Sequence, residues 1–341
     1  MKKIVMGAAA LLCAASMFAV DFSSKMAIAG NLFNWDGGDA KVKMLNPGDW
    51  NAKDGNNFVL TGSASLDKAG ATFRIVNADG ANNLNKSEYS LWLQPIDAVK
   101  MTVGYRQIKL ISGPNFGWWA STVDSGTVFG YSFDIKASDN LTFCLAMNPG
   151  TNTAFVDFSK TGIDVVGPFW ADATLNTDVG SIQFVVAKDA TVGAHGYSGW
   201  ATSPLAIALA YKNMPYEQTG FYADAAVSFK KNGDALVFQG VDSQIGGQYA
   251  MDALMLRLTN LIQYRTEFKY GFEFKGSYKI DNVTPYIVID GYDIMKSKMN
   301  VEVGVDTSVG ACAINVAAQT PVDFTNYKFS INVPVTFTVN F

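Results

Sequence analysis

Apolar and polar residues alternate along much of this chain. The clearest run is 262–275. Its apolar parity holds Ile262, Tyr264, Thr266, Phe268, Tyr270, Phe272 and Phe274, and its polar parity holds Gln263, Arg265, Glu267, Lys269, Gly271, Glu273 and Lys275. A helix turns about 100 degrees per residue and would mix the two sets, whereas an extended strand sends neighbouring side chains to opposite faces. The run therefore predicts a β-strand with one apolar and one polar face.

Similar runs recur roughly every 15 to 25 residues, separated by Gly, Asn, Asp and Pro clusters that indicate turns. The regular ones are 98–107, 128–136, 220–230 and 301–306. Less regular candidates are 57–66, 69–77, 87–94, 140–148, 167–175, 179–188, 204–212, 235–241, 284–292 and 311–318. Residues 251–262 fit a strand and a short amphipathic helix equally well. Three connections are long: 36–57, 111–125, which holds Trp118 and Trp119, and 190–203.

The N-terminal residues have the pattern of a signal peptide. Lys2 and Lys3 precede an apolar run over 4–12, and small residues follow. Cleavage after Ala19 is preferred and cleavage after Ser16 is the alternative, so we expect a signal peptide at 1–19 and one domain at 20–341. A lipid anchor on Cys13 is disfavoured, because the three residues before it make a poor lipobox.

The last fourteen residues alternate without interruption from Lys328 to Phe341. A final strand of this kind that ends in a carboxy-terminal Phe resembles the assembly signal of bacterial outer-membrane β-barrel proteins. The resemblance covers only about the last dozen residues, so it indicates an architecture and an export route. It implies a porin-like protein of the outer membrane that is exported through the periplasm. Pro334 costs one ladder hydrogen bond and departs mildly from the pattern.

Composition narrows the choice of fold. The net charge is -4, which disfavours binding to the phosphates of nucleic acid. Hydrophobic residues make up 49% of the chain, yet the longest uncharged stretch after the signal, 190–211, is broken by polar residues, Pro204 and three glycines. The apolar content is therefore spread over every second position, as in a barrel or a large soluble β-domain.

We expect an all-β fold, a transmembrane antiparallel β-barrel of about 16 strands, with a range of 14 to 18. A Lys or Arg that faces lipid near the bilayer centre costs about 2 to 4 kcal/mol, so the charged parity of each strand should face the lumen. The predicted pore-lining residues are Arg74, Lys100, Arg106, Asp134, Asp224, Arg265, Glu267, Lys269, Glu273, Lys275, Glu302 and Asp306. These charges could filter ions or simply pair across strands. Parity also places Cys144 inward and Cys312 outward.

Aromatic residues are expected to form belts at the two membrane interfaces. The candidates are Tyr89, Trp92, Tyr105, Phe129, Phe133, Phe169, Trp170, Phe329 and Phe341. Motifs for chemistry are few. His195 is the single histidine and lies in an expected loop, and the Asp-rich segments 36–39 and 79–83 are better explained as turns than as calcium loops. We therefore expect no enzyme activity, no cofactor and no metal.

The function that this architecture predicts is passive diffusion of small polar solutes, because a barrel of this width is too wide for side chains to fill. The expected partners are outer-membrane lipids, small polar solutes and, through the strand that ends in Phe341, the outer-membrane assembly machinery. The resemblance further implies a homotrimer as one assembly to test, and one long loop that folds into the pore. Two alternatives stay open: a surface adhesin or structural outer-membrane protein without a conducting pore, and a soluble secreted β-domain.

Overall fold

The computed structural model describes residues 20–42, 56–78, 86–111, 123–147, 156–192, 201–213, 219–294 and 298–341. The predicted signal peptide, the Trp118 and Trp119 pair and His195 lie outside the described residues. The described part is almost entirely β-structure, with one short 3-10 helix, η1 (Gly162–Val165). Within the same ranges, no helix is both long enough and apolar enough to cross a membrane.

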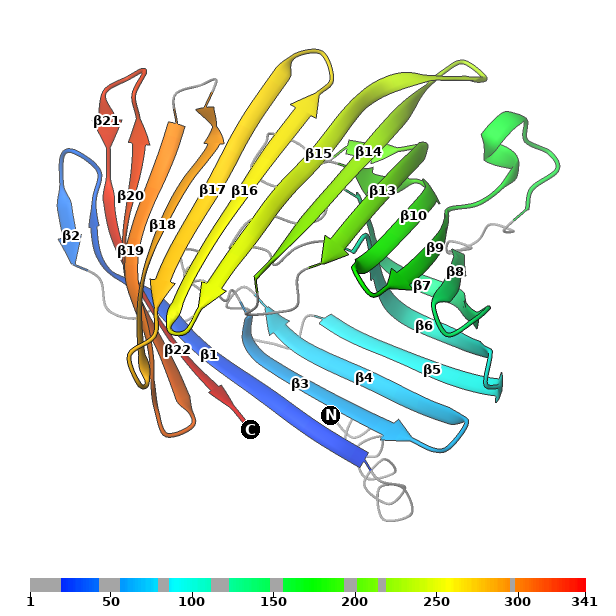
Figure 1. Ribbon diagram of the computed structural model, residues 1–341, viewed down its shortest axis with the longest axis horizontal. Coiled ribbons are helices and arrows are strands. Elements are labelled where there is room, and N and C mark those ends of the chain that lie inside the picture. Colours follow the sequence, from blue (N-terminus) through cyan, green and yellow to red (C-terminus); the bar gives the residue numbers. More distant parts are fainter. Residues whose placement is uncertain are drawn as a thin grey trace.

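Eighteen long strands form one closed wall in the described part of the chain (Figure 1). They are β1 (Val20–Trp35), β3 (Asn56–Ser65), β4 (Ala69–Ala78), β5 (Lys86–Ile96), β6 (Val99–Lys109), β7 (Val123–Lys136), β8 (Leu141–Met147), β9 (Phe169–Thr177), β10 (Gly180–Lys188), β13 (Leu205–Asn213), β14 (Gly220–Asn232), β15 (Ala235–Met251), β16 (Leu254–Tyr264), β17 (Phe268–Tyr278), β18 (Val283–Asp293), β19 (Lys298–Val309), β20 (Cys312–Asp323) and β22 (Ile331–Asn340). Four short strands extend the wall at the end away from the termini: β2 (Ala40–Val42), β11 (Ala190–Val192), β12 (Ala201–Ser203) and β21 (Lys328–Phe329).

The first and last strands pair with each other and close the barrel. β1 runs antiparallel to β22 from Lys25 opposite Asn340 to Trp35 opposite Ile331. Beyond β22, the backbone N–H of Phe341 donates to the carbonyl oxygen of Ser24 at 2.8 Å. Every strand thus has a hydrogen-bonded neighbour on both sides, which removes the open edges that a flat sheet would expose.

The prediction of an antiparallel barrel is confirmed, and the strand number stands at the upper limit of the predicted range rather than at 16. The ambiguous stretch 251–262 is a strand: β16 covers most of it and pairs along its whole length with β15 and β17. Strand pairing decides here, because the two neighbouring strands satisfy every backbone group that a helix would otherwise satisfy internally.

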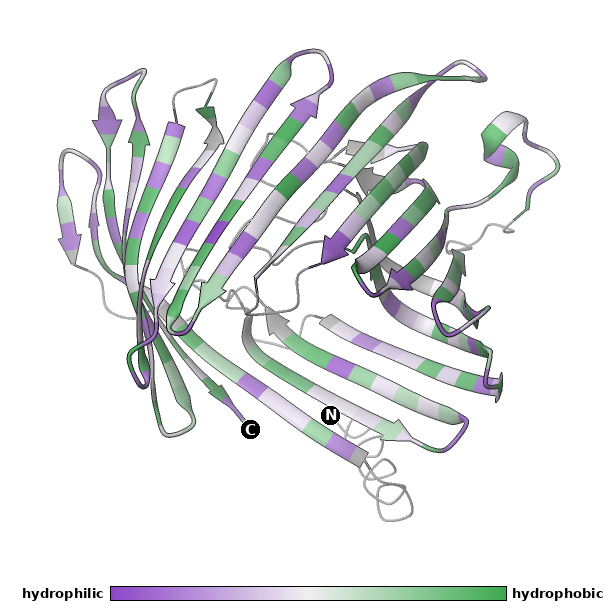
Figure 2. Cartoon of the chain, in the orientation of Figure 1, coloured by the Kyte–Doolittle hydropathy of each residue, from purple (hydrophilic) through white to green (hydrophobic). Residues whose placement is uncertain are grey.

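The two faces of the wall differ in crowding and in chemistry. On β5, Leu91 is 64% exposed, while Ser90 beside it is 8% exposed. Side chains on the concave inside of a closed barrel converge, and those on the convex outside diverge, so the crowded parity is the inner face. The exposed parity carries large apolar residues on strand after strand, such as Leu209 on β13 and Val303 on β19. Figure 2 shows the result as alternating hydrophilic and hydrophobic bands along the strands.

Candidate functional site on the inner face of the barrel

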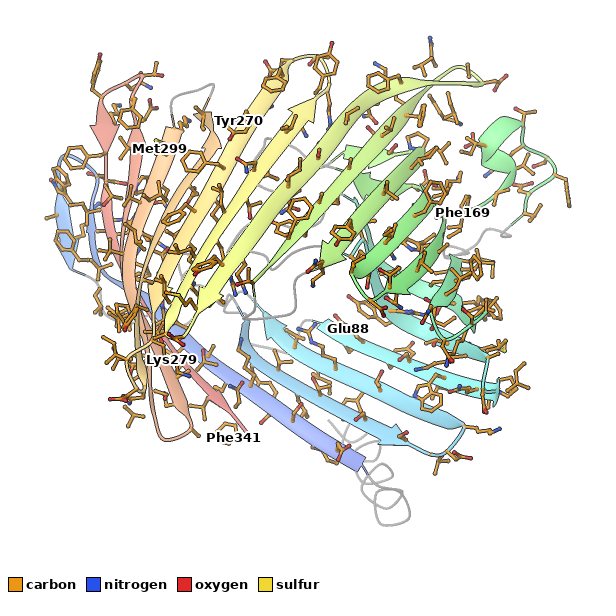
Figure 3. The ribbon with its side chains drawn as sticks, viewed as in Figure 1. Glu88, Phe169, Tyr270, Lys279, Met299 and Phe341 are labelled. Carbon is orange, nitrogen blue, oxygen red and sulfur yellow. The ribbon has the colours of Figure 1, made fainter. Side chains whose placement is uncertain are left out.

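Two predicted pore-lining arginines form ion pairs with acids on the neighbouring strand. Arg74 on β4 lies 3.3 Å from Glu88 on β5, which is labelled in Figure 3. Arg106 on β6 binds Asp134 on β7 through both of its terminal nitrogens, each at 2.8 Å, and also donates to Ser132 at 2.9 Å. This double contact fixes the planar guanidinium against one carboxylate and neutralises its charge locally.

Two predicted lysines lie over aromatic rings. The Lys100 ammonium is 4.6 Å from the ring centre of Trp92, and the Lys275 ammonium is 4.7 Å from that of Tyr286. A cation over the face of an aromatic ring is attracted by its quadrupole. Trp92 shares the inner parity of Ser90 and packs over Gly70, where an added Cβ would lie 2.4 Å from the indole nitrogen. The prediction that Trp92 belongs to an outer aromatic belt is therefore wrong.

A dense polar network covers the inner faces of β14–β20, and we call it the polar wall. Asp242 is 0% exposed, accepts a hydrogen bond from Gln263 at 2.5 Å and lies 3.4 Å from Arg265. Further along, Tyr286 donates to Glu302 at 2.5 Å and accepts from Asn315 at 2.9 Å. Buried polar groups are costly unless they are hydrogen-bonded, and these are linked from strand to strand.

The remaining predicted residues divide between the polar wall and a turn. Asp224 and Glu273 are each 2% exposed on the inner faces of β14 and β17, and Asp306 accepts a hydrogen bond from Asn315 at 2.6 Å. Glu267 differs, because it lies in the turn between β16 and β17 and its side chain is largely exposed. It contacts Lys269 on β17 at 3.3 Å. The alternating run continued through this turn in sequence, so parity could not reveal that the strand had ended.

Several inner-face polar residues were missed in the sequence. They are Glu88, Asp172, Asp242, Gln244, Gln248, Arg257 and Asp290. Each lies on the inner face of a strand for which no pore-lining residue was predicted, so extending the alternation across the less regular strands would have found them. The described residues hold no group of three or more His, Cys, Asp or Glu side chains that could bind a metal.

A different surface covers the inner faces of β8–β10 and β13, and we call it the small-residue wall. Its members are Ala146, Val185, Ala187, Ala206, Ala208 and Ala210, together with the indole of Trp170. Trp170 is 1% exposed and inward-facing, so its predicted place in an aromatic belt is wrong. Among the other belt candidates, Tyr89, Phe329 and Phe341 are exposed, as a belt requires.

Residues 108–111 at the end of β6 pack onto the small-residue wall, and we call them the inward segment. Leu110 is 0% exposed and belongs to the same apolar cluster as Ala146 and Val185. The backbone N–H of Ile111 donates to the side-chain oxygen of Gln183 on β10 at 2.7 Å. Because β6 and β10 are not neighbours in the wall, these contacts can form only across the inside of the barrel.

The strand pairing changes at the same place. β7 pairs with β8 only over Tyr131–Lys136, and its far end pairs with β11, where Asp124 is opposite Thr191. The ladder at this rim therefore skips the short strands β8 and β9. A register shift between Gln107 and Lys109 on β6 bends the chain next to this point. Together these features narrow the end of the barrel that lies away from the termini.

The two described cysteines lie on opposite faces. Cys144 lines an inner cavity beside Arg106, and Cys312 shares the outward parity of Val316, as parity predicted. Both are free thiols. The long connection 36–57 is described only at its ends, where β2 pairs with β1, and the third long connection, 190–203, includes β11 and β12.

Comparison with known proteins identifies similar folds and no sequence relative. No protein-family profile matches the chain, and no curated protein matches it. Among solved structures, OccK2 (OpdF) of Pseudomonas aeruginosa superposes with a TM-score of 0.58 at 7% identity, over 94% of this chain and 97% of that one. OpdQ of the same organism gives 0.57 at 8% identity, over 94% and 97%. The outer membrane protein OpdK gives 0.53 at 8% identity, over 94% and 99%. The likeness covers nearly the whole length of each chain and establishes the fold.

Proposed function

We propose that this protein is a channel of the bacterial outer membrane through which small polar solutes and ions diffuse passively. One observation carries the proposal: a closed barrel exposes large apolar side chains outside and keeps its ionic side chains inside. Lipid can solvate only the first surface, and water or a polar solute can contact only the second. A soluble sandwich would bury its apolar parity instead.

The similar solved structures support this proposal. OpdK is an outer membrane protein. The barrel of this chain is closed by pairing of its first and last strands, as β-strands that cross a membrane require. OccK2 was crystallised in complex with glucuronate and OpdK with vanillate, so barrels of this shape accept small organic molecules. By analogy, we propose that this chain takes solutes of similar size.

The inward segment makes the proposed channel narrow on one side. Its described residues, 108–111, pack over the small-residue wall. These contacts support a solute path between the inward segment and the polar wall. We propose that the eleven predicted charged residues other than Glu267 line this path. Their ion pairs leave fixed charges of both signs along it, which favours polar over apolar solutes.

Planar bilayers provide the direct test. Purified protein should insert with stepwise increases in current in potassium chloride, because each closed barrel adds one water-filled path. Extracts run unheated and boiled on a gel confirm that the inserted species is the folded barrel, since a closed barrel resists detergent until heated. A heat-modifiable barrel that inserts and never conducts would refute the channel and favour the structural or adhesin alternative.

The C-terminal strand supports one further part of the proposal, recognition by the outer-membrane assembly machinery. The side chain of Phe341 is exposed outside the wall while its backbone pairs with Ser24, so the pairing that closes the barrel does not cover the side chain that we propose the machinery contacts. Phe341→Ala should lower the amount of heat-modifiable barrel in membranes, with the unchanged level of total protein as control. A homotrimer stays a prediction, and the mass of the detergent-extracted protein tests it.

A further inference from the structure

A cavity of about 290 Å³ lies on the inner face below the inward segment. Its walls come from β6–β10, and the side chains that matter for its chemistry are Arg106, Asp134, Cys144, Asp172, Thr174 and Gln183. Ile108 of the inward segment closes one side, and the hydrogen bond from Ile111 to Gln183 holds the segment there. The cavity is therefore lined by both the strands of the barrel wall and the inward segment.

The charges around this cavity do not cancel. Arg106 forms a double contact with Asp134 and also lies within the electrostatic reach of Asp172. Asp172 itself is held by neutral donors, the indole N–H of Trp170 at 2.7 Å and the hydroxyl of Thr174 at 3.2 Å. Among the described residues, the ion pair of Arg106 is with Asp134 and not with Asp172. The three charged groups of the cavity, Arg106, Asp134 and Asp172, therefore leave one net negative charge.

The remaining lining groups are uncharged, and Phe143 and Ile108 among them are apolar. Thr142 and Thr174 supply hydroxyls, and Gln183 supplies an amide whose oxygen already accepts from Ile111. A carboxylate has about four lone-pair sites, and the two described bonds to Asp172 leave others for donors of a ligand. An ammonium group carries three N–H donors and a positive charge, so it matches both the geometry and the charge that Asp172 offers.

We propose that this cavity is a subsite for a small hydroxylated organic cation, such as a protonated amino sugar, with Asp172 as the group that binds its ammonium. The inference rests on the proposed channel function, because the ligand reaches the inner face through the lumen. An anion of the same size is disfavoured, since it would have to break the Arg106 and Asp134 pair to gain a positive partner. The preference is opposite in sign to the anionic ligand of the OccK2 complex.

Three sugars of similar size and different charge test the subsite: protonated glucosamine, neutral glucose and anionic glucuronate. Each is added to single channels in planar bilayers, and the concentration that half-blocks the current is measured. We expect glucosamine to block at about tenfold lower concentration than glucose, a difference of about 1.4 kcal/mol, because only its ammonium can form a hydrogen bond to Asp172 in which both groups are charged. Equal block by all three sugars would overturn the proposal.

Two variants assign the effect to the carboxylate. Asp172→Asn should remove the difference between glucosamine and glucose, whereas Asp178→Asn, which removes an acid from the exposed turn of the same β9 and β10 hairpin, should keep it. Glucosamine block that survives Asp172→Asn would refute the role of Asp172. The current in potassium chloride without sugar is measured first. A protein that conducts no current at this stage would refute the proposed channel function and would not bear on the subsite.

A second measurement does not depend on the folding of any variant. Cys144 lines the same cavity, so bound sugar should shield its thiol. Labelling of wild-type protein by a small water-soluble thiol reagent should slow in glucosamine and stay unchanged in glucuronate. The mass of the peptide that contains Cys144 reports the labelling. The same slowing in glucuronate, or none in glucosamine, would contradict the proposal.

Discussion

The small-residue wall and the polar wall lie on the inner face of one barrel, yet they differ in what covers them. On β13 the inward positions are Ala206, Ala208 and Ala210, and each is almost fully buried beneath other chain. On β14–β20 the inward positions include acids, amides, tyrosines and basic residues that bond to one another, with smaller residues such as Ala313 between them. The outward positions of both regions carry large apolar residues, such as Leu209 and Val303.

This difference indicates that the size of the inward side chains on a strand depends on what lies beside that strand inside the barrel. A single methyl group at every second position leaves room for a second layer of chain, and its apolar surface stabilises that layer by about 25 cal/mol per Å² buried. A polar wall instead contacts water or solute, and it holds its shape by hydrogen bonds from strand to strand. The same alternation therefore serves two purposes inside one barrel.

Ala208→Glu places a charge in the small-residue wall and should have the largest effect on the free energy of unfolding. The new carboxylate would lie in the apolar cluster without a partner, or it would displace the inward segment. We expect a loss of about 3 to 5 kcal/mol in the free energy of unfolding, because an uncompensated buried charge costs that much. Urea titration of the heat-modifiable gel band measures the loss. Single-channel current should rise in the protein that still folds.

Ala313→Glu is the matched control on the polar wall. Ala313 is exposed on the inner face of β20, so the same substitution places a carboxylate in water. We expect a change of less than about 0.5 kcal/mol in unfolding free energy, as for most surface substitutions. Equal losses of unfolding free energy in Ala208→Glu and Ala313→Glu would show that the inner faces of the two walls do not differ in burial.

Tyr286→Phe tests whether hydrogen bonds hold the polar wall. The phenol bonds both Glu302 and Asn315, and Tyr286 is almost completely buried. We expect a loss of about 1.5 to 3 kcal/mol in unfolding free energy, because one of the two bonds involves a charged group. Urea titration measures it. An unchanged midpoint would mean that water replaces both bonds at no cost.

Tyr222→Phe provides a graded comparison on the same wall. Its hydroxyl bonds the neutral hydroxyl of Thr259 at 2.5 Å and is buried to a similar degree. A neutral hydrogen bond contributes about 0.5 to 1.5 kcal/mol, so this loss should be the smaller of the two. The reverse order would indicate that the charge on Glu302 does not strengthen its bond to Tyr286.

Sequence predicted the barrel because alternation reports directly on the two faces of a strand. In the run 262–275 the polar parity lies on the inner face, except at Glu267 in the turn, and the polar parity of the C-terminal strand does so too. Cys144 and Cys312 followed from the same rule. This rule depends on a difference in polarity between the two faces of a strand. It succeeds where the inner face is polar and the outer face is apolar, as on β17.

The rule loses force where both faces are apolar. On β13, Leu205–Asn213, small residues alternate with large ones, and polarity does not distinguish the faces, so the small-residue wall was not anticipated. Trp92 and Trp170 were assigned outward because aromatic residues are common at membrane interfaces, yet both project inward. A glycine opposite Trp92 was the missed signal, since a ring can lie flat on the wall only where the facing residue lacks a side chain.

The two regions also meet outside the lumen, where the connection from β8 to β9 reaches the hairpin of β14 and β15. Lys231 on β14 forms an ion pair with Asp164 in η1, and Thr161 donates to Asp234 in the hairpin turn at 3.4 Å. Figure 1 shows this connection at the right, beside the tip of that hairpin. The contact joins the small-residue side of the barrel to the polar side.

Acid should loosen this link, with the smallest effect of the series. The bond from Lys231 holds the pKa of Asp164 below its ordinary value of 3.8. A depressed carboxyl pKa contributes stability above the unfolded pKa, and that contribution is lost as pH falls through the lower folded value. Limited proteolysis with an acid-active protease should therefore cut 160–166 faster at pH 3 than at pH 5, relative to a cut elsewhere in the same chain. In the Asp164→Asn variant this segment should be cut at the same relative rate at pH 3 and pH 5, because residue 164 then has no carboxyl to titrate. A difference that persists in the variant would assign the effect to another group.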